Sequence, residues 1–193
     1  MLAAIFLKEM NQKTIEEIVN RHLQKWADLQ LNKLPTHIEP EMADPTQEQS
    51  EEWRTWIPIK SKVTDEEIRD FEEQLGHRLP DSYKTFLKHK HFYDLQISEV
   101  SFCSHPVNIW RRKQVDKIFD GYPREFLIDK GYIPFADWSD WGLLCFDTTR
   151  HNGDFNFPIV LWDHEIADEV KDEYNDFLSM LTTIDIDAQK NSS

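Results

Sequence analysis

The side chains best suited to chemistry lie in three short segments of the chain. The first is HKHFYD, residues 89–94, which places His89 and His91 two residues apart, with Cys103 and His105 nearby. A structural zinc site needs four Cys or His ligands, usually as two closely spaced pairs. No second pair is present, so we interpret these as surface histidines at a helix end and a strand and expect no metal site.

The second segment is DWSDWG, residues 137–142. It supplies Asp137 and Asp140, and Asp147 follows. Two carboxylates could act as a general acid and a general base. However, Asp and Ser are also common turn residues, and tryptophans commonly pack against a sheet. We therefore interpret DWSDWG as a turn.

The third segment is WDHE, residues 162–165, in which a histidine stands between two acids. A catalytic triad needs a nucleophile, and the chain has no G-x-S-x-G motif, phosphate loop or dinucleotide fingerprint. We expect no catalytic residue and no cofactor, and expect Asp163 or His164 to begin a C-terminal helix.

The charge of the chain narrows the class of partner. It has 36 acidic and 22 basic residues, a formal net charge of −14. Such a field repels nucleic-acid phosphates and anionic lipids and attracts cationic proteins. We expect no direct nucleic-acid or membrane contact, and a partner with a basic surface.

The two cysteines and the N-terminal residues indicate the cellular compartment in which we expect the protein. Cys103 and Cys145 are far apart and lack metal-type spacing, so we expect buried thiols in a reducing cytoplasm. MLAAIFLKEM lacks the basic start and cleavage site of a signal peptide, and no segment is apolar for long enough to span a membrane.

The N-terminal part predicts one helix and a linker. Residues 14–31 have a helical apolar stripe, and Thr14 with Glu17 fits a capping box. Residues 34–52 contain three prolines and many acids, which is typical of a solvated linker. We predict a helical extension and acidic linker over residues 1–52, a main domain over 53–184 and a flexible tail over 185–193.

A strongly specified helix pair opens the main domain. Thr64 and Glu67 form a second capping-box pattern, and Gly76 stands where a helix ends with positive φ. Pro80 is suited to the first turn of the next helix. The segment predicts two helices joined by a short corner.

Short strands follow the helix pair. We predict them at residues 97–102, 132–135, 143–147 and 157–162, with the last two forming an antiparallel hairpin around Asn152-Gly153. Apolar residues from Ile166 to Leu181 predict an amphipathic C-terminal helix. The expected fold class is α+β, with helices packed on a mainly antiparallel sheet.

Three segments in order resemble one family. VTDEEIRDFEEQLGHRLPDSYKTFL resembles the first two helices of the SUKH superfamily, of the Smi–Knr type. GYIPFADWSDWGLLCFD resembles its central strand pair, and FPIVLWDHE resembles its next strand. The resemblance covers roughly Trp53 to Leu181 and leaves out the N-terminal helix and the linker.

This resemblance implies a twisted sheet covered by helices and a role as a protein-binding module. Bacterial members are commonly immunity proteins that neutralise cognate polymorphic toxins, often nucleases, by direct contact. The expected function is therefore toxin neutralisation. Two alternatives stay open: a regulatory interaction protein of the cell-wall or signalling type, and, more weakly, a small hydrolase or metal-binding protein.

We expect the partner to bind a groove near DWSDWG and WDHE. Residues 163–176 contain seven acids and only one basic residue, and Trp138 and Trp141 are candidate anchors. The segment WRRKQVDK, residues 110–117, is basic, so the charge of the chain is not acidic throughout. We expect a monomer or weak dimer. The expected partner-binding residues are Asp137, Trp138, Asp140, Trp141, Asp163, His164, Glu165, Asp168, Glu169 and Asp172.

Overall fold

The computed structural model describes residues 2–48, 52–150, 155–166 and 169–191, with side chains from Phe6 onward. The predicted Asn152-Gly153 turn and the candidate Asp168 lie outside these residues. The helices are α1 Leu2–Asp28, α2 Asp65–Leu75, α3 Asp81–Leu87, α4 Trp110–Val115 and α5 Phe177–Lys190. Short helical turns are η1 Pro40–Met42, η2 Asp116–Asp120, η3 Arg124–Phe126 and η4 Ile128–Lys130.

The strands form one main sheet and two small ribbons. The main sheet has the order β10-β9-β8-β7-β6-β5, and every neighbouring pair is antiparallel. Its strands are β5 Gln96–Ile97, β6 Val100–Phe102, β7 Tyr132–Trp138, β8 Gly142–Asp147, β9 Ile159–Asp163 and β10 Val170–Tyr174. The ribbons pair β1 Lys33–Leu34 with β2 Arg54–Thr55, and β3 Ile59–Lys60 with β4 Lys90–His91. The α+β fold class and the antiparallel pairing of the last two predicted strands are confirmed.

Both faces of the main sheet are covered. On the face toward α3 and α5, Tyr83, Phe135, Phe146 and Phe177 form an aromatic cluster with ring centroids 4.2–6.2 Å apart. The opposite face buries a smaller cluster beneath the segment that runs from η2 to η4. This smaller cluster consists of Leu127, Leu143, Cys145, Val160 and Trp162. Because alternate residues of a strand point to opposite faces, β8 contributes to both clusters.

The helix pair α2–α3 forms as predicted. The Thr64 hydroxyl accepts from the Glu67 N–H, and the Glu67 carboxylate accepts from the Thr64 N–H, which completes the capping box. Gly76 ends α2 with φ of +72°, a conformation that glycine adopts without strain. Pro80 precedes the first residue of α3.

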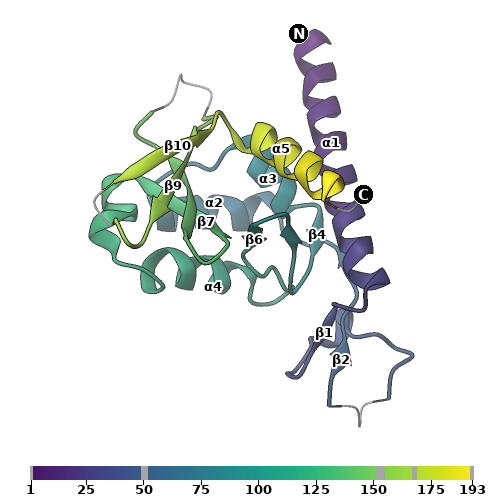
Figure 1. Cartoon of the computed structure of the whole chain (residues 1–193). Helices are drawn as coiled ribbons and strands as arrows, with labels where there is room; N and C mark the ends of the chain where they lie inside the picture. The colour runs from purple at the N-terminus through teal and green to yellow at the C-terminus, as the bar shows by residue number, and fades with distance from the viewer. Residues whose placement is uncertain (1, 49–51, 151–154, 167–168, 192–193) are drawn as a thin grey trace.

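Helix α1 is longer than predicted. Thr14 lies inside it, and its hydroxyl donates to the Met10 carbonyl at 3.0 Å, so the predicted N-terminal cap is wrong. Ile15, Ile18 and Val19 are buried, and α1 packs against α3 and α5. Its N-terminal turns extend beyond the rest of the molecule (Figure 1). Among the described helices, none is both long enough and apolar enough to cross a membrane.

The segments predicted to be solvated are partly packed. In the expected acidic linker, Ile38 and Met42 are buried, and just before it Asn32 donates to the Trp56 carbonyl at 2.7 Å. The expected flexible tail is helical as far as Lys190, with Ala188 buried, because α5 continues to pack against α1. The division of the chain at residue 52 stays a prediction.

Two predicted elements are wrong. The C-terminal helix from Ile166 does not form, because residues 170–174 pair with β9 as the edge strand β10. The helix begins later, at the Asp176 cap, whose carboxylate accepts from the Ser179 N–H at 2.7 Å. The single strand predicted at 97–102 is the hairpin β5–β6, which turns at Ser98 with φ of +53°.

Candidate partner-binding surface

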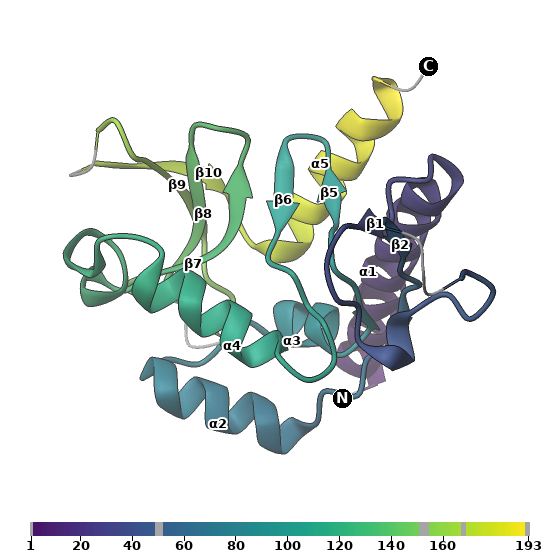
Figure 2. The same ribbon diagram turned by 90° about the horizontal axis from the view of Figure 1, so that it is seen from below.

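Three hairpin turns meet at one end of the main sheet. Val100, where β6 begins, pairs with Trp138, where β7 ends. Gly142, where β8 begins, pairs with Asp163, where β9 ends. The turns β5–β6, β7–β8 and β9–β10 therefore lie side by side, and Figure 2 shows them on the side of the molecule opposite α2. We call this surface the turn end: residues 98–99, 139–141, 163–166 and 169.

The β7–β8 turn projects a tryptophan into solvent. The Trp141 N–H donates to the Trp138 carbonyl at 3.1 Å, and the Ser139 N–H donates to the Glu99 carbonyl of the neighbouring turn at 2.8 Å. A Cβ at Gly142 would lie 2.0 Å from the Trp162 carbonyl oxygen, so the close approach of β8 to β9 requires glycine. Trp141 is 61% exposed.

The β9–β10 turn is closed by Asp163. Its carboxylate accepts from the Glu165 N–H at 2.8 Å, and its carbonyl accepts from the Ile166 N–H at 3.2 Å. Ile166 is 55% exposed, and His164 and Glu165 are exposed beside it. Asp163 ends a strand and closes a turn, so the prediction that it or His164 begins a helix is wrong.

The turn end combines apolar side chains with carboxylates. Its described residues include no Lys or Arg, and its acids are Glu99, Asp140, Asp163, Glu165 and Glu169. Exposed Trp141 and Ile166 lie among them. Large apolar side chains ringed by polar groups are typical of protein-binding surfaces.

Six of the candidate residues therefore lie at the turn end: Asp140, Trp141, Asp163, His164, Glu165 and Glu169. Two others flank it. Asp137 is paired with Lys117, whose Nζ lies 2.6 Å from Asp137 Oδ1 on the η2 side of the sheet. Trp138 is half-buried against Tyr174, with ring centroids 6.2 Å apart.

Asp172 lies away from the turn end, in an ion-pair network at the surface. Arg150 Nη2 lies 2.5 Å from Asp172 Oδ1, and Arg150 Nε lies 2.6 Å from Asp147 Oδ2. Asp147 is buried where β8 ends, opposite Tyr132. The hydrogen bond from Arg150 lowers the pKa of the Asp172 carboxyl. We call Asp147, Arg150 and Asp172 the Arg150 cluster.

Asp137 and Asp147, two of the three carboxylates considered for acid–base chemistry, are not brought together. Asp137 lies near the turn end and Asp147 at the other end of the β7–β8 hairpin. Each has its own cationic neighbour, Lys117 or Arg150. The DWSDWG segment forms the turn that was predicted from its composition.

The expected surface location is wrong for two of the histidines. His91 and His105 are fully buried and stacked, with ring centroids 4.9 Å apart. His91 Nε2 accepts from the Lys62 N–H, His91 Nδ1 donates to the His105 carbonyl and His105 Nε2 donates to the Leu87 carbonyl. Burial lowers the pKa of His105 to about 3. Burial also raises the pKa of the Cys103 thiol to about 11.

His91 and His105 stabilise the fold through their hydrogen bonds to backbone groups. Within the described ranges, no group of three or more His, Cys, Asp or Glu side chains is arranged to hold a metal ion. The histidines instead connect the segment after α3 to residue 105, which the sequence alone could not indicate.

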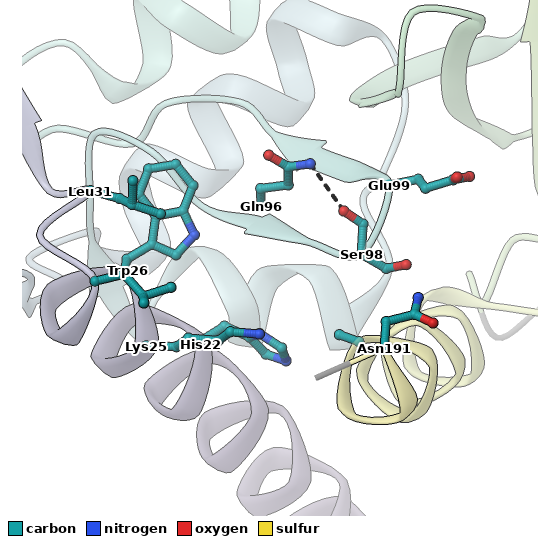
Figure 3. A pocket seen from close by; sticks show the side chains of 10 residues that line it. His22, Lys25, Trp26, Leu31, Gln96, Ser98, Glu99 and Asn191 are labelled. Carbon is teal, nitrogen blue, oxygen red and sulfur yellow. Dashed lines mark hydrogen bonds between the residues drawn. The ribbon is translucent and has the colours of Figure 1, made fainter. Parts of the chain in front are cut away.

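A groove whose lining includes no residue of DWSDWG or WDHE adjoins the turn end. It has a volume of about 390 Å³ and lies between the last turns of α1 and α5 and the β5–β6 turn (Figure 3). Its lining residues are His22, Lys25, Trp26, Leu29, Leu31, Gln96, Ser98, Glu99, Ala188 and Asn191. The apolar stripe predicted for residues 14–31 was the only sequence signal for it, and Leu29, near the end of that range, is 58% exposed.

Comparison with known families identifies the scaffold. The family model described as SMI1 / KNR4 family (SUKH-1) matches residues 62–183, which run from just before α2 into α5. None of the curated proteins compared with the chain matches it significantly. The matched residues are more than half of the 193-residue chain and include the whole main sheet. The chain belongs to the SMI1 / KNR4 family (SUKH-1).

Proposed function

We propose that this protein is a non-catalytic immunity protein that neutralises a cognate toxin, possibly a nuclease, by binding it directly at the turn end. The observation that carries the proposal is the position of Trp141. This large aromatic side chain is 61% exposed, on a hydrogen-bonded turn among carboxylates. Family membership supports a protein-binding role and is compatible with immunity.

The charge of the turn end favours a cationic partner. Its described residues carry five acids and no Lys or Arg, in a chain of net charge −14. Such a surface speeds the encounter with a basic protein and disfavours acidic ones, while affinity comes mainly from a few buried anchors. We assign the anchor role to Trp141 and Ile166.

The internal use of the other polar groups supports a non-catalytic role. Arg150 holds Asp147 and Asp172, Lys117 holds Asp137, and the buried histidines bond to backbone groups. Cys103 and Cys145 are unpaired and buried, in keeping with a reducing cytoplasm. We propose a cytoplasmic monomer or weak dimer.

The experiment is to mix the purified protein with the toxin domain encoded beside its gene and to measure the dissociation constant. We expect a stable complex and relief of toxicity when both are co-expressed. Trp141→Ala should raise Kd at least about 30-fold, because truncation of a central anchor costs roughly 2 kcal/mol or more. Glu73→Gln is the control, because Glu73 is exposed on α2, away from the turn end.

Absence of a complex, with no relief of toxicity, would overturn the proposed function. The regulatory alternative then predicts a different protein partner, recovered from growing cells. If the complex forms and Trp141→Ala binds as tightly as the wild type, the immunity function stands, but the assignment of the turn end is wrong.

A further inference from the structure

A cleft lined by lysines lies between α1, α3 and the β3–β4 ribbon. It has a volume of about 650 Å³. We call it the lysine cleft, after Lys8, Lys60, Lys84, Lys88 and Lys90. The acids in its lining are Glu16, Asp65 and Asp81. With the histidine of the lining counted as neutral, five lysines and three acids give the cleft a formal charge of +2, in a chain of net charge −14.

Lys60 and Lys90 stand directly opposite each other in the β3–β4 ribbon. The Ser61 N–H donates to the His89 carbonyl at 3.0 Å, so the next pair, Lys60 with Lys90, is of the non-hydrogen-bonded kind, in which opposite side chains lie closest. Like charges in such a pair destabilise the pairing of the strands. Each strand of this ribbon has only two residues, so the fold itself gains nothing from the two lysines.

The other three lysines of the cleft are paired with carboxylates. The pairs are Lys8 with Asp81 at 3.8 Å, Lys84 with Glu72 at 2.8 Å and Lys88 with Asp65 at 2.6 Å. Lys60 and Lys90, by contrast, have no ion-pair partner within the part of the chain that the structure describes, although Lys90 is half-buried. Their two ammonium groups therefore remain available to an anion that enters the cleft.

The composition of the lining favours a small phosphorylated anion. Among the described residues, the lining contains no Phe, Tyr, Trp or aliphatic side chain that would hold an apolar ligand. Its cations are all lysines, which bind phosphate as compact point charges, whereas arginine is better suited to carboxylates. A concave cationic site concentrates its field, so a small anion is attracted there even though the whole chain repels nucleic acid.

We propose that the lysine cleft binds an oligophosphate, a short chain of phosphate groups that is either inorganic or part of a nucleotide. One phosphate group binds between the ammonium groups of Lys60 and Lys90 and removes their repulsion. A neighbouring phosphate group accepts from Lys88, the next cation along the same segment. Several charges along one flexible chain match several lysines along one cleft better than a single anion does.

This site is separate from the proposed protein interface. Asp65, the first residue of α2, lines the cleft, whereas the turn end lies on the side of the molecule opposite α2 (Figure 2). Lys8 and Lys60 also precede residue 62, where the family match begins. Oligophosphate binding would therefore be a property that α1 and β3 add to the family scaffold.

Nuclear magnetic resonance titration with sodium tripolyphosphate, without divalent cations, tests the site. We expect saturable shifts at the amides of Lys60 and of residues 88–90. The double variant Lys60→Gln/Lys90→Gln should raise Kd about tenfold, because each lysine contributes the range of one exposed ion pair. The control Lys13→Gln/Lys171→Gln removes the same charge from two exposed lysines outside the cleft, so Kd should change less than about twofold.

Thermal denaturation gives a second readout of the same pair. Without ligand, Lys60→Gln/Lys90→Gln should raise Tm by about 2 °C, because it removes the repulsion between opposite strands. Tripolyphosphate at ten times the wild-type Kd should raise Tm of the wild type by about 4 °C and that of the double variant by only about 1 °C. A Tm that falls in the ligand-free double variant would contradict the repulsion on which the proposal depends.

Adenosine triphosphate distinguishes the two sources of the phosphate chain. Equal Kd values for it and for tripolyphosphate would support recognition of the chain alone, and binding at least tenfold tighter would support a nucleotide as the ligand. Tetraglutamate that binds as tightly as tripolyphosphate would overturn the proposal in favour of an acidic peptide. Shifts that do not saturate, or an unchanged Kd in the double variant, would also overturn it. Because no step uses the toxin domain, these results leave the proposed function untouched.

Discussion

The two ends of the main sheet use their carboxylates in opposite ways. In the Arg150 cluster, one guanidinium bridges Asp147 and Asp172, at 2.6 and 2.5 Å. At the turn end, the described residues contain five acids and no basic side chain, and Trp141 and Ile166 are exposed among them. Paired charges at one end stabilise the fold, whereas unpaired charges at the other remain available to a partner. Mutations at the two ends should therefore separate stability from binding.

The largest expected loss of stability comes from a substitution that disrupts the backbone of the turn end. Gly142→Ala places a Cβ 2.0 Å from the Trp162 carbonyl oxygen, so β8 and β9 must move apart. We expect the free energy of unfolding to fall by about 3 kcal/mol, at the upper range for overpacking. Urea denaturation followed by far-UV circular dichroism measures it. Unchanged stability would show that the turn end is not held by the close approach of these strands.

Buried His105 should make the free energy of unfolding depend on pH. Burial lowers the pKa of His105 from 6.5 to about 3, so the unfolded chain binds a proton more readily than the folded one. The stability from neutral His105 is complete above pH 6.5 and is lost as pH falls from 6.5 toward 3. At pH 4.5 the loss from this group is on the order of 3 kcal/mol.

Denaturation midpoints from pH 7.5 to pH 4.5 measure this slope. His164 is exposed at the turn end, and His164→Gln should leave the slope unchanged. Stability that stays constant down to pH 4.5 would contradict a buried neutral His105.

Arg150→Met tests whether the Arg150 cluster contributes to stability and not to binding. It keeps the apolar stem of Arg150 and removes the charge that faces Asp147, which is buried and would retain hydrogen bonds from Thr149. We expect a loss of about 1–2 kcal/mol in the free energy of unfolding, because a buried carboxylate loses one charged partner. The affinity for the toxin domain, measured by calorimetry, should stay within twofold. A large loss of affinity would place the Arg150 cluster in the interface.

Glu165→Gln is the reciprocal change at the turn end, with the smallest expected effect. Glu165 is exposed and has no cationic side chain near it in its own turn, so stability should change by less than about 0.5 kcal/mol. The association rate with the toxin domain should fall about twofold and become less sensitive to salt. Stopped-flow fluorescence at two salt concentrations measures both. A rate that rises on neutralisation would show that the partner surface is not basic.

The scaffold could be predicted from local signals, and the surface only in part. Thr64, Glu67 and Gly76 specify the ends of α2 by contacts within a few residues, which a sequence pattern captures. Ile166, Val170, Tyr174 and Phe177 have helical spacing, yet pairing with β9 makes residues 170–174 an edge strand. Long-range pairing overrides local periodicity there.

Long-range contacts also limited how well the candidate site residues could be predicted. Asp140, Trp141 and Glu165 were predicted together because DWSDWG and WDHE contain them, and antiparallel pairing places both segments at one end. Asp172 was placed with them by its position in an acidic run, although Arg150, distant in sequence, holds it elsewhere. The groove joins residues 22–31 to residues 96–99 and 188–191, so no local pattern could have indicated it.

Hydrogen–deuterium exchange of the protein with and without the toxin domain tests the central claim most directly. Binding at the turn end predicts slower exchange for the amides of Ser139–Gly142, Glu165 and Ile166, with Thr148–Arg150 unchanged. Protection that appears at Thr148–Arg150 and is absent from the turn end would contradict the account.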